Sequence, residues 1–160
     1  MDTMTVATTI LLAFLPISEL RGAIPFGYFR GMDIWLAAPL AIVCNALVAP
    51  VAYLFLSTLH GVFYRHWRWY IRFFDRTVAK ARLKLQDKIN RFGYWGILFF
   101  VAIPLPMTGA WTGTLGAWVL GLDKRKTMLA VCGGVLIAGI IVTTIIMLGV
   151  GMNSLFVKVI

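Results

Sequence analysis

Glu19 and Arg21 stand two positions apart in a stretch that is otherwise apolar or small. Glu19 is the single glutamate of the 160-residue chain, and both residues lie between Pro16 and Pro25. Ionisable side chains in such a segment are costly to bury, so they usually face a cavity or a partner. Burial disfavours the charged form of a carboxyl group, which makes Glu19 a candidate proton carrier. Arg21 keeps its charge and offers a planar fork suited to phosphate.

A structural role is the alternative for this pair. Glu19 and Arg21 could neutralise one another inside the protein without serving a ligand. Residues two apart do not face each other on a helix, which weighs against a simple ion pair. The sequence leaves both interpretations open.

A second segment, residues 103–113, is rich in small and polar residues but carries no charge. Ser18 and Thr108 each precede a predicted helix and are expected to be its N-cap. Small residues in both segments allow a neighbour or a ligand to approach the backbone closely. A tryptophan of the second segment is a candidate cavity-lining residue, with packing as the alternative. The candidate binding residues are Ser18, Glu19, Arg21, Gly22, Thr108, Gly109 and Trp111.

Four apolar stretches must position these residues. Residues 34–59 and 127–152 are long enough to span a bilayer, which takes about 20 residues. Residues 5–29 and 93–122 are interrupted by prolines, so that each unbroken part covers only half of that thickness. A half-helix, a break and a second half-helix are typical of a re-entrant hairpin. The expected helix breaks are Pro16, Pro25, Pro104 and Pro106.

The two halves of the chain also correspond to each other. Leu15-Pro16 matches Ile103-Pro104, Gly22-Ala23 matches Gly109-Ala110, and Gly31-Met32-Asp33 matches Gly121-Leu122-Asp123. A hairpin returns to its own side and one span crosses, so two copies in series are inverted. We therefore predict an all-α integral membrane protein with a single transmembrane domain. It comprises repeat one (1–60), an interfacial amphipathic segment (61–93) and repeat two (94–160). A bundle of four full, kinked spans is the alternative.

Charge placement distinguishes these two topologies. Most of the basic residues behind the net charge of +9 fall in the central segment and at Lys124–Lys126. Re-entrant hairpins put both clusters on one side, whereas four spans would separate them. The positive-inside rule favours the hairpins, with the central segment in the cytoplasm and both termini outside. Residues 76–92 are amphipathic, which predicts a helix lying on anionic lipid, with a linker docked on the protein as the alternative.

Several function classes find no support in the residues. The chain has no phosphate-binding loop, no nucleophile–base constellation and no zinc spacing, so we expect neither an enzyme nor a cofactor or metal site. Cys44 and Cys132 sit in apolar runs as packing residues. Asp33 and Asp123 begin the two spanning helices and are expected to be N-caps. The basic residues lie beside membrane spans, which disfavours nucleic acid as a partner.

The predicted hairpins would bring two helix N-termini together. If both are re-entrant, the N-termini of their second half-helices point inward from opposite sides. Free N–H groups and positive dipole ends then converge near the midplane, which suits an anion.

At the two hairpins the sequence resembles the small multidrug export protein family, a branch of the DedA superfamily. The matching segments are SELRGAIPFG at residues 18–27 and FVAIPLPMTGAWTG at residues 100–113. The resemblance implies an inverted re-entrant architecture and relatives that recycle polyprenyl-phosphate carriers with proton or sodium coupling. It also implies a prokaryotic cell membrane. DedA members carry arginines in the second hairpin, where this chain has Pro106, Thr108 and Trp111.

The function predicted from these features is transfer of a lipid phosphate, such as a polyprenyl-phosphate carrier, between leaflets. Glu19 would carry a proton, Arg21 would bind the phosphate, and Ser18 and Thr108 would supply capped helix ends. The coupling ion would be H+ or Na+. Export of a small cation, with Glu19 as its site, is the alternative, and a non-transporting membrane scaffold is the second. The expected partners are membrane lipids and a second copy of the chain, because glycine-rich faces could pack in a homodimer.

Overall fold

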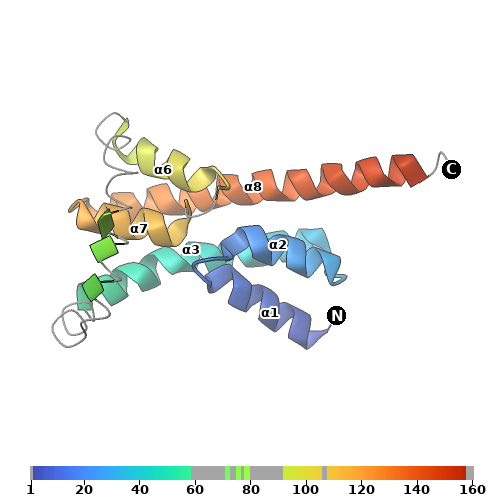
Figure 1. Ribbon diagram of the computed structural model, residues 1–160, viewed down its shortest axis with the longest axis horizontal. Coiled ribbons are helices and arrows are strands. Elements are labelled where there is room, and N and C mark those ends of the chain that lie inside the picture. Colours follow the sequence, from blue (N-terminus) through green and yellow to red (C-terminus); the bar gives the residue numbers. More distant parts are fainter. Residues whose placement is uncertain are drawn as a thin grey trace.

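The part of the chain that the structure describes consists of helices and the short turns that join them. The computed structural model describes residues 2–58, 71–72, 75–76, 78–79, 92–105 and 108–157, with side chains as far as residue 149. The predicted helix over residues 76–92 lies almost wholly outside these residues. The named helices are α1 (Thr3–Phe14), α2 (Glu19–Phe29), α3 (Ile34–Thr58), α6 (Tyr94–Ala102), α7 (Ala110–Val119) and α8 (Lys124–Val157) (Figure 1).

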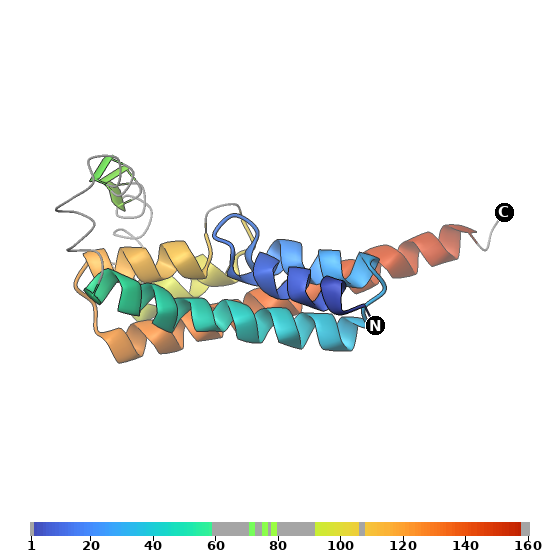
Figure 2. The ribbon, with the colours of Figure 1, turned by 90° about the horizontal axis from the view of Figure 1, so that it is seen from below.

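The helices α3 and α8 are long and apolar enough to cross a membrane. The qualifying segments are Ile34–Thr58 and Lys124–Gly149, of 25 and 26 residues. At 1.5 Å per residue each exceeds the roughly 30 Å of the hydrocarbon core. They pack against each other and run side by side (Figures 1 and 2). The prediction of an all-helical protein with two helices of spanning length is therefore confirmed within the described residues.

The four shorter helices form two hairpins. Helices α1 and α2 pack as one pair, while α6 and α7 pack mainly against α8 and α3. Figures 1 and 2 show the hairpins approaching from opposite ends of the α3–α8 pair, with their turns meeting near its middle. The start of α2 therefore lies beside the start of α7, as the hydrogen bond from the Trp111 N–H to the Glu19 carboxyl group also shows.

Each hairpin turns at a residue that precedes a proline. Leu15 ends α1 at φ −68° and ψ 134°, and Ile103 ends α6 at φ −76° and ψ 116°. Proline disfavours helical geometry in the residue before it, so both helices stop there. The breaks predicted at Pro16 and Pro104 are confirmed, and Pro106 lies outside the described residues.

The break predicted at Pro25 is wrong. Pro25 lies inside α2, which continues to Phe29. A proline within a helix costs about 3 kcal/mol because it lacks an N–H and crowds the preceding turn. Burial of Leu20, Ala23 and Ile24 on one face of α2 holds the helix together across it.

The joints that lead into the two long helices have the same geometry, 90 positions apart. Gly31 and Gly121 adopt φ values of 85° and 67°, which favour glycine. The N–H groups of Arg30 and Gly31 donate to the carbonyls of Phe26 and Tyr28, and those of Leu120 and Gly121 donate in the same way to the carbonyls of Gly116 and Trp118. Asp33 and Asp123 then accept from the N–H groups of Trp35 and Lys126, both at 2.9 Å, so both predicted N-caps are confirmed.

This register corrects one of the expected correspondences. Counting 90 positions from each residue pairs Glu19 with Gly109 and Arg21 with Trp111, whereas Gly22 pairs with Thr112 rather than Gly109. The second break is longer than the first, since seven residues separate α6 from α7 and four separate α1 from α2. Matching glycine and alanine pairs in the sequence could not reveal that the two breaks differ in length.

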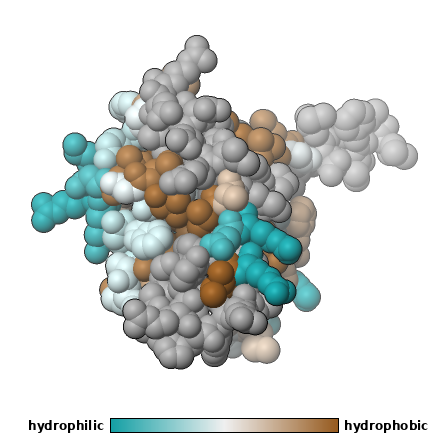
Figure 3. All heavy atoms as spheres, turned by 60° about the vertical axis from the view of Figure 1, so that its left-hand side comes forward, coloured by the Kyte–Doolittle hydropathy of each residue, from teal (hydrophilic) through white to brown (hydrophobic). Residues whose placement is uncertain are grey.

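The start of α8 lies beside the end of α3. The ammonium of Lys124 stands 5.2 Å from the ring centroid of Tyr53, and that of Lys126 stands 5.7 Å from the ring of Tyr94. Figure 3 brings this end of the molecule forward and shows hydrophilic side chains projecting beside apolar ones. The α6–α7 hairpin therefore returns to the end from which it started.

Close approach of α6 to α8 depends on Gly134. A Cβ there would stand 2.7 Å from the carbonyl oxygen of Leu98 and 2.7 Å from Cβ of Val101. We expect Gly134→Ala to lower the free energy of unfolding in detergent by about 1–3 kcal/mol through overpacking. Gly149→Ala in the same helix is the control, because nothing lies within 4 Å of its added Cβ. Equal stability of the two variants in denaturant titrations would contradict this packing.

Candidate functional site

Glu19 of the first hairpin reaches the start of the second hairpin's α7. Its side chain is buried, with 5% exposed. Oε1 accepts a hydrogen bond from the backbone N–H of Trp111 at 3.4 Å, and the backbone N–H of Ala110 also donates to the carboxyl group. An ionised carboxyl group is stabilised there by free N–H groups and the positive end of the helix dipole.

The backbone at Glu19 is held in an unusual conformation. Its φ of 49° is the single positive value at a described non-glycine residue. Such a conformation costs on the order of 1 kcal/mol or more for a residue with a Cβ, and it persists where surrounding contacts impose it. At Glu19 the positive φ occurs together with the hydrogen bond between its carboxyl group and the start of α7.

Arg21 crosses to the second hairpin as well. Nη1 donates to the carbonyl of Leu105, while Nη2 donates to the carbonyl of Thr108 at 2.7 Å and to its hydroxyl at 3.2 Å. The nearest approach of Arg21 to Glu19 is 4.0 Å, between Nη2 and Oε2. The two residues therefore contact the second hairpin more closely than they contact each other.

The prediction that Ser18 is the N-cap of α2 is confirmed for its position, whereas the prediction that Thr108 is the N-cap of α7 is wrong. The N-cap of α7 is Gly109, and the Thr108 hydroxyl instead lies within the break, 2.8 Å from the carbonyls of both Ile103 and Leu105, between which its one proton is shared. Ser18 does occupy the N-cap position of α2 but makes no side-chain capping bond. Its hydroxyl lies against Gly22, where a Cβ would collide with it.

Trp111 makes the reciprocal contact from the second hairpin to the first. Its indole Nε1 donates to the carbonyl of Phe14 at 2.8 Å, at the end of α1. Asn45 of α3 donates to the neighbouring carbonyl of Ala13, also at 2.8 Å. Asn45 was not among the predicted site residues. Its sequence signal was a lone amide inside a long apolar helix, which needs an internal partner.

The two hairpins thus satisfy each other's broken backbone. Helix ends leave carbonyl and N–H groups without helical partners, and a membrane interior offers no water to bind them. Arg21 bonds to the carbonyls of the second break, Trp111 to that of the first, and Glu19 to the N–H groups of α7. We call this set of contacts the hairpin clasp. It brings Glu19, Arg21, Thr108, Gly109 and Trp111 together.

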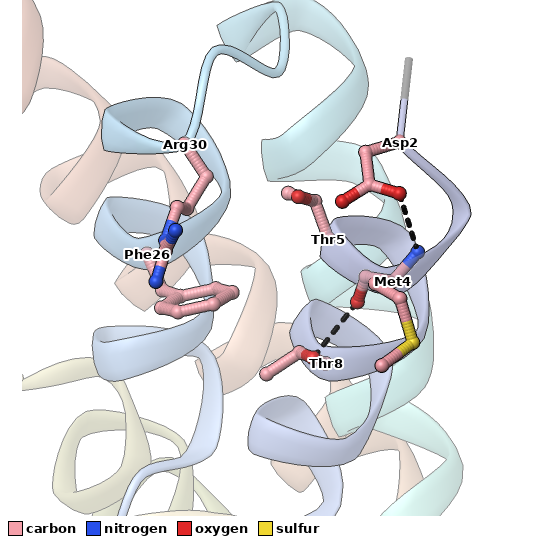
Figure 4. A pocket seen from close by; sticks show the side chains of 6 residues that line it. All are labelled: Asp2, Met4, Thr5, Thr8, Phe26 and Arg30. Carbon is pink, nitrogen blue, oxygen red and sulfur yellow. Dashed lines mark hydrogen bonds between the residues drawn. The ribbon is translucent and has the colours of Figure 1, made fainter.

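A small open cleft lies at the other end of the first hairpin, away from the clasp. Asp2 and the α1 residues stand on one side and the α2 residues on the other, with the Arg30 guanidinium 5.6 Å from the ring centroid of Phe26 (Figure 4). Its lining combines carboxylate, guanidinium and hydroxyl groups, and comprises Asp2, Met4, Thr5, Thr8, Phe26 and Arg30. It does not touch the predicted site residues.

The part of the chain that carries the clasp also carries a family signature. Residues 19–141 match the family described as "Putative small multi-drug export protein". The match begins at Glu19 and covers α2, α3, α6, α7 and about the first half of α8. Searches of the curated proteins and of the solved structures give no match. Since the family match covers more than half of the sequence, the chain belongs to this family.

The indole hydrogen bond of the clasp gives a direct prediction. Trp111→Phe keeps the ring but leaves the Phe14 carbonyl unpaired, so we expect the free energy of unfolding in detergent to fall by about 1–3 kcal/mol. Trp35→Phe is the matched control, because Trp35 is 72% exposed, and it should change stability by about 0.5 kcal/mol or less. A stability loss no larger at Trp111 than at Trp35 would rule out the bond as a structural link.

Proposed function

We propose that this member of the small multi-drug export protein family is a membrane transporter that moves small cations out of the cell, with Glu19 as the exchange site. The observation that carries the proposal is a buried carboxyl group at the contact between two hairpins. Glu19 is the one buried carboxylate among the described residues. A buried carboxylate can bind either a proton or a cationic molecule, and exchange of one for the other would couple export to proton entry.

The proposal includes re-entrant hairpins arranged as an inverted repeat. Helix α1 has 12 residues, about 18 Å at 1.5 Å each, which is half of the bilayer. The joints of the two halves share one geometry, and Lys124 lies beside Tyr53 at one end of the long helices. Both observations support two hairpins that enter from opposite faces and meet at mid-depth. Within this proposal both termini face outward and the central basic segment lies in the cytoplasm.

The clasp supplies a mechanism for coupling. An ionised Glu19 accepts hydrogen bonds from the start of α7 and so holds the two hairpins together. Protonation removes the charge that favours this contact, because the helix dipole stabilises the anion rather than the neutral acid. The proton that binds on one side of the membrane is released on the other as the cation replaces it. The hairpins can then separate when Glu19 is neutral and close again when it is charged.

The same contacts weigh against an anionic substrate at the clasp. Both terminal nitrogens of Arg21 bind backbone carbonyls, and the N-terminus of α7 already receives Glu19. A lipid phosphate would have to displace these partners. The family description also favours export of small molecules over lipid transfer. We further propose that the protein acts without enzymatic chemistry, in a prokaryotic cell membrane and as a homodimer.

Site-directed labelling tests the topology. Single cysteines at Lys124 and Arg76 should react with a membrane-impermeant maleimide from the same, cytoplasmic face of intact cells and inverted vesicles. Four full spans would instead place them on opposite faces. Labelling of the two positions from different sides would therefore exclude re-entrant hairpins.

Transport in proteoliposomes tests the function. With an imposed proton gradient, the wild type should export ethidium, and Glu19→Gln should lower the initial rate by about tenfold or more, equal to about 1.4 kcal/mol or more. Asp33→Asn is the matched control, since asparagine also caps a helix, and should stay near the wild-type rate.

A second assay in the same vesicles separates the alternatives. Fluorescent phospholipid and polyprenyl-phosphate analogues should cross the bilayer no faster than in protein-free vesicles. Lipid transfer that Arg21→Ala abolishes, with no ethidium export, would overturn the proposal in favour of lipid transport. The absence of both activities from folded protein would overturn transport of either kind.

A further inference from the structure

The carboxyl group of Glu19 occupies the space that a side chain at position 109 would need. A Cβ built on Gly109 would overlap the Glu19 carboxyl group, which lies directly against this backbone. Gly109 itself is buried and forms the N-cap of α7. Any side chain at position 109 would therefore point into the space that the Glu19 side chain now fills.

The two positions are equivalent in the two halves of the chain. The joints after α2 and α7 fix a separation of 90 positions, which relates Glu19 to Gly109 and Arg21 to Trp111. Arg21 and Trp111 also act equivalently, since each donates to a carbonyl of the opposite break. Glu19 and Gly109 thus face each other across the contact between the halves, with one side chain between them.

The backbone at each position accepts the residue found at the other. Position 19 has a φ of 49°, which glycine adopts readily and other residues adopt at a cost. Position 109 has φ −116° and ψ −164°, an extended conformation open to any residue. Exchanging glutamate and glycine between the two positions is therefore compatible with both conformations.

We propose that positions 19 and 109 form one shared seat for a single carboxylate, which either hairpin can supply to the transport cycle. Gly109 is a positioning residue in this arrangement, because its lack of a side chain admits the Glu19 carboxyl group to the start of α7. A glutamate at position 109 would enter the same space from the opposite side and direct its carboxyl group toward α2. This inference rests on the proposed function and makes the location of the carboxylate, rather than the hairpin that carries it, the requirement for export.

The test compares four variants of the full-length protein in proteoliposomes: E19G, G109E, the exchange variant E19G/G109E, and the control E19G/G149E. The control has the same composition as the exchange variant, but its carboxylate lies on α8, where a Cβ at position 149 meets nothing within 4 Å. Ethidium export is measured against pH, and thermal unfolding is measured in detergent.

If positions 19 and 109 share one seat, a glutamate at position 109 should restore export to the E19G variant, whereas a glutamate at position 149 should not. E19G should lose export by about tenfold or more. E19G/G109E should recover most of it and show the pH dependence of the wild type, while E19G/G149E should stay at the level of E19G. G109E alone should unfold several degrees below the wild type, because two carboxyl groups compete for one space, and E19G should relieve that loss in the exchange variant.

The two readouts separate the seat from the transport activity. If folded E19G/G109E exports no faster than E19G/G149E while the wild type is active, the shared seat is wrong and the proposed function stands. If the wild type exports no ethidium, the proposed function fails, and thermal unfolding alone decides on the seat. An exchange variant that unfolds no higher than G109E would then overturn it.

Discussion

A helix that ends inside the packed protein must find partners for its unpaired backbone groups, and this requirement governs the arrangement of the clasp. Side chains of the opposite hairpin bond to the end of α1, to the break between α6 and α7, and to the start of α7: these side chains are Trp111, Arg21 and Glu19, respectively. Asn45 adds one bond from α3. Each hairpin therefore depends on the other for its stability, and separating them exposes polar backbone that lipid cannot bind.

The clasp is symmetric in plan and asymmetric in chemistry. The joints at Gly31 and Gly121, 90 positions apart, share backbone geometry, but the side chains at the paired positions of the clasp differ in polarity or charge. Glu19 corresponds to Gly109, Arg21 to Trp111, and Asn45 to the buried Val135. The charged groups thus reside on the first half, and the second half supplies neutral donors and a glycine. In the proposed transport cycle, Glu19, the one buried carboxylate among the described residues, would switch the clasp between two states as it binds and releases a proton.

Much of the helix arrangement could be predicted from the sequence, because prolines and the lengths of the apolar segments indicate where helices end. The breaks at Pro16 and Pro104 and the N-caps Asp33 and Asp123 follow from local chemistry. Contacts between distant segments could not be predicted in the same way. The bonds of Arg21 to backbone carbonyls of the second hairpin were not foreseen beside its predicted role in binding phosphate, and Pro25 stays inside α2 because packing outweighs its local preference. The expected anion site at α7 is filled by the protein's own carboxylate, a choice that depends on how the two hairpins meet.

The distance between the hairpin turns is the most direct measure of whether the charge on Glu19 holds the clasp closed. Nitroxide labels at Ile17 and Ile103, which are 97% and 44% exposed, would report it by dipolar broadening in lipid vesicles. If the charge on Glu19 holds the clasp closed, strong broadening is expected at alkaline pH and is lost as the pH falls and Glu19 is protonated. The Glu19→Gln variant should show no such pH dependence. Equal broadening at every pH in the wild type, or the same pH dependence in both proteins, would contradict this role of the charge.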